Sequence, residues 1–98
     1  MPDPARAWAI GHVSVKDADK WQRYRERVPA TIAPFGGAVL LRGHVTDVLD
    51  GTHRHTDTVV LSFPDVESAR RWHSSSAYQA LIPLRHEAAE VDLVIVGG

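Results

Sequence analysis

The sequence predicts a single α+β domain in which helices cover one face of a four-stranded antiparallel sheet. Three observations support this prediction: four short apolar segments have strand character, two capped helical segments lie among them, and polar turns or prolines separate most of these elements. The length of 98 residues fits one domain, taken as residues 1–98. Residues 1–6 contain two prolines and are expected to form a loose N-terminal arm.

The segment 7–15, AWAIGHVSV, alternates as a strand does. One predicted face carries larger or polar side chains, namely Trp8, Ile10, His12 and Ser14. The other face carries smaller residues, which would let a helix approach closely: Ala7, Ala9, Gly11, Val13 and Val15. Because both faces contain apolar residues, we expect both to be covered.

A helix is expected after this strand, with Asp17 as its N-cap. Its apolar residues recur at spacings of three, four and four, at Trp21, Tyr24, Val28 and Ile32. Pro29 cannot donate a backbone hydrogen bond, so a kink or a restarted turn is expected there. The segment 34–37, PFGG, ends the helix.

Two further strands are expected at residues 38–42 and 58–63. Gly43 is expected to bulge the first of them, because residues 44–49 retain strand character. The polar segment 50–57, DGTHRHTD, predicts a turn between the two strands.

The last third of the chain predicts a helix capped by Asp65, a break at residues 74–76 and a second helical stretch whose later part begins near Pro83. Residues 91–96, VDLVIV, then predict the fourth strand. The order β-α-β-β-α-β, with the helices on one face, is the ferredoxin-like arrangement.

Composition limits the classes of partner. Eleven basic and twelve acidic residues leave a formal charge of −1, so neither nucleic acid nor a membrane surface is expected as a partner. The absence of cysteine excludes disulfides, thiolate metal sites and cysteine nucleophiles. The N-terminus lacks the pattern of a secretion signal and no apolar run approaches a membrane span, so a soluble cytoplasmic protein is expected.

The sheet face away from the helices needs a cover, because Trp8 and Ile10 would lie on it. A second copy of the same sheet would supply that cover through a two-fold interface. Burial of each large apolar side chain there would contribute roughly 1.5–3 kcal/mol. The sequence therefore predicts a homodimer.

Several segments together resemble a known family. They are AWAIGHVSV, WxxYRxxVP, FGGxVLLRG, FPDVESARRWHSSSAYQALIPLR and VDLVIVGG. The chain is similar to the small bacterial proteins called domain of unknown function 1330, within the dimeric α/β-barrel superfamily. The resemblance implies protomers that pair sheet to sheet, with a cavity between sheet and helices or inside the barrel. It implies no single activity, since similar barrels serve as cofactor-free monooxygenases, isomerases, decarboxylating or cyclising enzymes, haem-degrading proteins and ligand binders.

His12 is the candidate catalytic residue, because an imidazole near a cavity is a natural general base or hydrogen-bond donor. The alternative is a core histidine that a neighbour satisfies. Arg42 and Arg85 are candidates for binding an anionic group, since a guanidinium matches carboxylate geometry. The resemblance adds that Arg85 matches an arginine that follows the YQAL segment. The alternatives are an ion pair of Arg85 with Asp92 or Glu87, and an exposed strand-end role for Arg42.

Trp72, His73 and Tyr78 flank the serine-rich link and are candidates for a pocket mouth, although core packing is the stronger interpretation for Trp72. His44, which departs from the usual pattern of the resembled family, completes the ligand-binding candidates. His53 and His55 could capture zinc or nickel, but a solvated hairpin explains them better, so neither a metal nor a cofactor is predicted.

Two functional hypotheses follow. The first is a cofactor-independent enzyme of isomerase, lyase, cyclase or monooxygenase type that acts on a small organic acid or aromatic metabolite. The second is a non-catalytic homodimeric ligand-binding or structural protein, in which the polar residues of the pocket only satisfy one another. The number of polar residues on the predicted barrel-lining face favours a ligand site without establishing catalysis.

Overall fold

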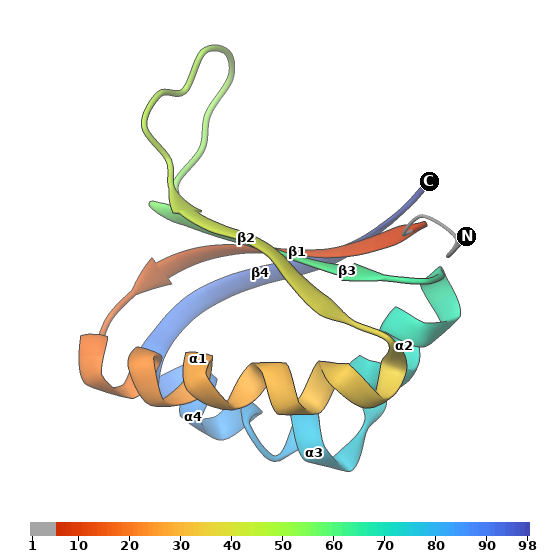
Figure 1. Cartoon of the computed structure of the whole chain (residues 1–98). Helices are drawn as coiled ribbons and strands as arrows, with labels where there is room; N and C mark the ends of the chain where they lie inside the picture. Colours follow the sequence, from red (N-terminus) through yellow and green to blue (C-terminus); the bar gives the residue numbers. More distant parts are fainter. Residues whose placement is uncertain (1–5) are drawn as a thin grey trace.

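Four strands form one antiparallel sheet in the order β2-β3-β1-β4, as a computed structural model of the chain shows for residues 6–98 (Figure 1). The strands are β1 (Ala7–Val15), β2 (Ala38–His44), β3 (Asp57–Phe63) and β4 (Ala89–Gly97). The helices α1 (Ala18–Ile32), α2 (Val66–Ser74), α3 (Ser76–Gln79) and α4 (Ile82–Ala88) lie on one face of the sheet (Figure 1). The predicted ferredoxin-like fold is confirmed. The expected arm at residues 1–6 lies outside the described residues, apart from Arg6.

Strand β1 lies in the middle of the sheet and pairs with both β3 and β4. Its small residues face the helices: Ala7, Ala9 and Val13 are fully buried. The alternate residues, Trp8 and Ile10 among them, are half-buried on the open face. The two faces of β1 therefore differ as the sequence predicts.

Helix α1 begins where predicted, because the carboxylate of Asp17 accepts a hydrogen bond of 3.1 Å from the backbone N–H of Lys20. The restarted turn considered at Pro29 does not occur, since α1 continues through Pro29 to Ile32 before the short 3₁₀ turn η1 (Ala33–Phe35). Proline removes one helix hydrogen bond, and burial of Val28 and Ile32 on either side of it holds the helix together.

The irregularity in β2 lies at Leu40 and not at Gly43, because the register with β3 shifts between Val39 and Leu41. Gly43 pairs regularly with Thr58. The strand character expected for residues 44–49 ends at His44, and residues 45–56 form a loop that projects from the sheet (Figure 1).

The last third of the chain follows the predicted order. Asp65 accepts a hydrogen bond of 2.7 Å from the backbone N–H of Ser68 and caps α2, and Ser75 separates α2 from α3. Pro83 lies in the first turn of α4, where its missing N–H removes no helix hydrogen bond. No helix within residues 6–98 is long and apolar enough to cross a membrane.

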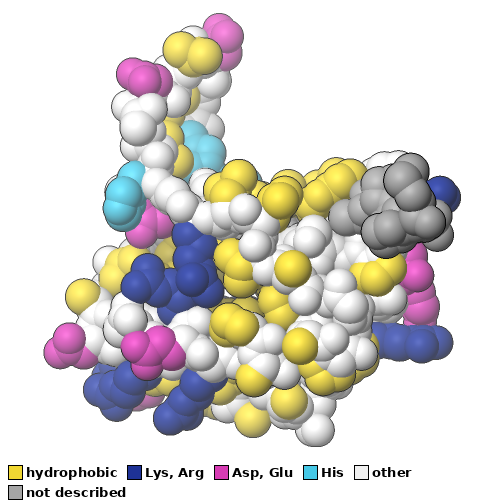
Figure 2. All heavy atoms as spheres, in the orientation of Figure 1, with side chains coloured by type: hydrophobic (Ala, Val, Ile, Leu, Met, Phe, Trp, Pro, Cys, Tyr) yellow, Lys and Arg dark blue, Asp and Glu magenta, His cyan; other side chains and the backbone are white. Residues whose placement is uncertain are grey.

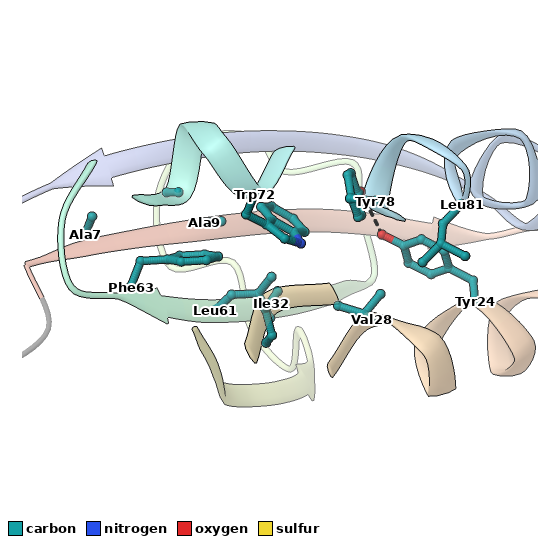
Figure 3. Packing of buried hydrophobic residues seen from close by; sticks show 11 residues of the cluster. Ala7, Ala9, Tyr24, Val28, Ile32, Leu61, Phe63, Trp72, Tyr78 and Leu81 are labelled. Atoms are coloured by element: carbon teal, nitrogen blue, oxygen red, sulfur yellow. Dashed lines mark hydrogen bonds between the residues drawn. The ribbon is translucent and has the colours of Figure 1, made fainter. Parts of the chain in front are cut away.

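The core lies between the sheet and the helices, and aromatic residues form its centre (Figure 3). The ring of Trp72 packs 4.2 Å from that of Tyr78 and 5.5 Å from that of Phe63, measured between centroids. The indole N–H of Trp72 donates a 3.0 Å hydrogen bond to the hydroxyl of Thr31. Trp72 is therefore a core anchor, the interpretation that the sequence favoured.

Candidate functional site

A cavity of about 210 Å³ lies between α1 and the helix-covered face of the sheet. Most of its lining is apolar and comes from β1, β3, β4 and α1, with Gly11, Val28, Val59, Leu61 and Leu93 among the contributing residues. Trp72 and Tyr78 add aromatic walls from α2 and α3. Such a cavity suits an apolar or aromatic body of small size.

The small residues of β1 leave room for this cavity. A Cβ atom added at Gly11 would lie 3.0 Å from Cγ1 of Val59 and within 4 Å of Val91 and Leu93, all of which line the cavity. A side chain at this position would therefore take up space that the cavity now occupies. The face of β1 that carries small residues lets the helices approach the sheet closely and also forms the floor of the cavity.

Two tyrosine hydroxyls meet at one part of the cavity wall (Figure 3). The oxygens of Tyr24 and Tyr78 lie 2.8 Å apart, and Nη1 of Arg85 donates a 2.7 Å hydrogen bond to the Tyr78 oxygen. The hydrogen bond between the tyrosines uses only one of their two hydroxyl protons, and within residues 6–98 no acceptor takes the second proton. Burial, followed by the neighbouring Tyr78, raises the pKa of Tyr24 far above its ordinary value, so Tyr24 stays a neutral phenol.

Arg85 does not line the cavity itself but donates a hydrogen bond to Tyr78, which does. Of the ion pairs considered from the sequence, neither forms: within the described residues Asp92 bonds Arg54 and His55, and Glu87 pairs with Lys20. Nε of Arg85 is buried without a hydrogen-bond partner in the same part of the chain. The guanidinium is thus directed at the Tyr78 hydroxyl.

The polar mouth of the cavity is formed by Arg42 and His44 from β2, Asp57 from β3 and Arg25 from α1. Nδ1 of His44 and Oδ1 of Asp57 are 2.6 Å apart. Between residues 6 and 98, neither Arg25 nor Arg42 has a carboxylate within ion-pair distance. Figure 2 shows basic side chains gathered between the base of the 45–56 loop and helix α1. The charged groups of the mouth are therefore two guanidinium groups and the carboxylate of Asp57.

His12 lies on the opposite face of the sheet from this cavity. Its Nδ1 is 3.3 Å from Nε2 of His53, which folds back from the projecting loop. His55 is buried beside them, with its ring nitrogens 2.9 Å from the Ser14 hydroxyl and 2.6 Å from the Asp92 carboxylate. The structure thus separates His12, the candidate catalytic residue, from the wall that carries the binding candidates Tyr78 and Arg85.

These loop histidines do more than form the solvated hairpin that the sequence favoured, because they hold the loop against β1 and β4. The hydrogen bond from His55, followed by the charge of Arg54, lowers the pKa of Asp92. No set of three side chains able to hold a metal ion occurs within residues 6–98.

Of the ligand-binding candidates, four line the cavity: Arg42, His44, Trp72 and Tyr78. Arg85 reaches it through Tyr78, and His73 packs against the rings of Trp72 and Tyr78 without lining it. Sequence reasoning missed Tyr24, Arg25 and Asp57. The sequence pattern assigns Tyr24 to the apolar side of a helix and Asp57 to a turn. The available signal was the WxxYR segment, in which Tyr24 and Arg25 are adjacent.

Comparison with known proteins supplies the family and the fold. The sequence profile described as Domain of unknown function (DUF1330) matches residues 6–98. A comparison with curated proteins gave no match.

Several solved structures share the fold. A protein of unknown function from Rhodopseudomonas palustris is 14% identical, with a TM-score of 0.78 over 98% of this chain and 84% of that one. SnoaB from Streptomyces nogalater, a cofactor-independent oxygenase, is 10% identical, with a TM-score of 0.67 over 97% and 94%. A dimeric ferredoxin-like protein of unknown function from Thermobifida fusca is 11% identical, with a TM-score of 0.61 over 98% and 93%. At these identities the likeness concerns the fold alone.

Proposed function

This chain belongs to the DUF1330 family, and we propose that it binds a small apolar or aromatic molecule with an anionic group in the cavity between α1 and the sheet. One observation carries the proposal. Two guanidinium groups, those of Arg25 and Arg42, stand at the mouth of an apolar cavity with no carboxylate partner in the described part of the chain.

The cavity and its mouth fit the two halves of such a ligand. The apolar lining takes a ring or a branched hydrocarbon body, and the arginines bind a carboxylate through paired charge-assisted hydrogen bonds. The alternative of a structural protein whose pocket groups only satisfy one another is less well supported, because neither Arg25 nor Arg42 has a carboxylate partner between residues 6 and 98, and Arg25 donates only to the neutral amide oxygen of Gln22.

The proposal extends to chemistry without a cofactor. The hydroxyl proton that the Tyr24–Tyr78 hydrogen bond does not use would polarise a carbonyl or hydroxyl at the inner end of the ligand, and Arg85 would orient Tyr78 for this role. The cofactor-independent oxygenase from Streptomyces nogalater has the same fold, which makes such chemistry compatible with this architecture. A small organic acid or an aromatic metabolite would be the substrate.

We also propose that two copies pair through their open sheet faces. Large apolar side chains remain exposed there, and Figure 2 shows them along the upper surface of the sheet. They include Leu41, Val94 and Val96. Related structures from Thermobifida fusca and Bacteroides fragilis are described as dimeric, which supports the same assembly here.

Binding of phenylacetate and of its uncharged analogue phenylacetamide tests the ligand class. Trp21 and Trp72 line the cavity, so quenching of tryptophan fluorescence reports occupancy. We expect the acid to bind more tightly than the amide, and Arg25→Gln and Arg42→Gln each to weaken binding of the acid about tenfold, about 1.4 kcal/mol.

Arg27→Gln is the matched control, because Arg27 is an exposed arginine of the same helix outside the cavity. Equal affinities for acid and amide, unchanged in the Arg25 and Arg42 variants, would refute the proposed anion site.

A further inference from the structure

We propose that His44 and Asp57 form a proton-transfer pair at the cavity mouth, with His44 as the general base and Asp57 as its positioning residue. The substrate class is an oxo acid with an aromatic or branched apolar body. This inference rests on the proposed function, because it needs a ligand that Arg25 and Arg42 hold by its carboxylate. Beyond ligand binding, the inference assigns a reaction, proton transfer, and the group that performs it, the imidazole of His44.

The geometry of the pair fixes which nitrogen is basic. His44 ends β2 and stands directly opposite Asp57, which begins β3. With 2.6 Å between Nδ1 and Oδ1, the ionised carboxylate accepts the Nδ1 proton. The lone pair of the neutral imidazole is then on Nε2, which has no hydrogen-bond partner within the described residues. An acceptor nitrogen oriented by a carboxylate is the arrangement that a general base requires.

The different solvent exposure of the two side chains assigns the role of base to His44 and that of positioning residue to Asp57. The Asp57 side chain is 22% exposed and is held in the sheet, whereas the His44 side chain is 85% exposed at the mouth. Asp57 therefore fixes one edge of the imidazole while the other edge remains open to a ligand that enters the cavity. The cations of Arg25 and Arg42 share the mouth with the carboxylate of Asp57. Two positive charges thus outweigh one negative charge there, and an anionic ligand is not repelled.

The position of the arginines limits which proton His44 reaches. A carboxylate held by Arg25 and Arg42 leaves the first carbon atoms of the ligand at the mouth, next to His44 and Asp57, while the apolar body enters the cavity. A C–H group in that place is acidic enough for an imidazole only if it adjoins a carbonyl group. The expected substrates are therefore 2-oxo or 3-oxo acids.

The proposed step is an enolisation. Nε2 of His44 takes the proton from the carbon next to the carbonyl, the C–H electron pair forms a C=C bond, and the carbonyl π pair moves to oxygen. The neighbouring guanidinium groups stabilise the enolate oxygen. The imidazolium then returns the proton to oxygen, which gives the enol, or to carbon, which restores the substrate. Atoms and charge balance without an oxidant or cofactor.

Phenylpyruvate is a suitable probe, since it combines an aromatic ring, a 2-oxo group and a carboxylate. Proton NMR in D₂O measures exchange of its C3 hydrogens, and tryptophan quenching measures its binding separately. We expect the wild-type protein to accelerate exchange over buffer, and His44→Gln to lower this acceleration about 100-fold with binding retained. His86→Gln is the control, because His86 is an exposed histidine of α4 outside this cavity.

Asp57→Asn tests whether Asp57 positions His44, through measurements that a change in protein stability alone would not alter. We expect kcat for exchange to fall about tenfold while KM stays within twofold, and the ¹⁵N NMR signals of His44 to lose the fixed Nδ1-protonated form.

The possible outcomes separate the two proposals. Binding of phenylpyruvate together with an exchange rate that is equal in wild type and His44→Gln would overturn the proton-transfer pair and leave the proposed function standing. A failure of phenylpyruvate to bind would overturn the assigned ligand class and the pair together.

Discussion

Replacement of Tyr78 by phenylalanine tests whether the tyrosine pair and Arg85 form one buried hydrogen-bonded unit. The Tyr78 oxygen accepts a 2.7 Å hydrogen bond from Nη1 of Arg85 and lies 2.8 Å from the Tyr24 oxygen. Tyr78→Phe removes both interactions and leaves a guanidinium whose Nε already has no hydrogen-bond partner among residues 6–98. We expect a loss of about 2–4 kcal/mol in the free energy of unfolding, since a hydrogen bond from a charged donor is worth more than a neutral one.

Tyr24→Phe is the matched comparison, because it removes the hydrogen bond between the tyrosines and leaves the hydrogen bond from Arg85 to Tyr78 in place. We expect it to cost about 0.5–1.5 kcal/mol. Urea unfolding followed by tryptophan fluorescence measures both values, at one fixed protein concentration because association of subunits adds to apparent stability. If Tyr78→Phe costs no more than Tyr24→Phe, Arg85 does not depend on the Tyr78 hydroxyl and the reasoning is refuted.

Three further predictions concern other parts of the molecule. Val94→Asp places a charge on the open sheet face, where Val94 is 48% exposed, and should yield a monomer by analytical ultracentrifugation; an unchanged dimer would place the interface elsewhere. The pKa of Asp92 is lowered by His55, so its carboxylate stabilises the fold above its unfolded pKa, and this contribution is lost as pH falls through the lower folded pKa. Urea titrations should therefore show a less steep loss of stability below about pH 4 in Asp92→Asn than in wild type, and identical slopes would contradict this. His12→Ala should leave phenylacetate binding unchanged, because His12 lies across the sheet from the cavity; a large loss of affinity would place the ligand on the open face.

The fold was largely predictable from sequence because its determinants are local. Asp17 and Asp65 cap their helices through side chains three residues from the N–H groups that they bind. The alternation in β1 assigned small residues to the helix side and Trp8 to the open face, as observed. The bulge at Leu40 was missed because nothing in the AVLLR segment distinguishes Leu40 from its neighbours.

The site was less predictable because its contacts join distant parts of the chain. Tyr24 and Tyr78 are 54 residues apart, and only the packing of α1 against α3 brings their hydroxyls together. His44 was identified, but its partner Asp57 depends on the register of β2 and β3 across a loop whose conformation the sequence does not specify. His12 was assigned to the correct face of β1, whereas the cavity lies on the other face.

A crystal structure of the protein with bound phenylpyruvate is the most direct test of the proposed ligand site. We expect the phenyl ring between α1 and the sheet, against Trp72 and Val59, and the carboxylate within hydrogen-bond distance of Arg25 or Arg42. A ligand that occupies the open sheet face beside His12, or one whose carboxylate points away from both arginines, would contradict this account.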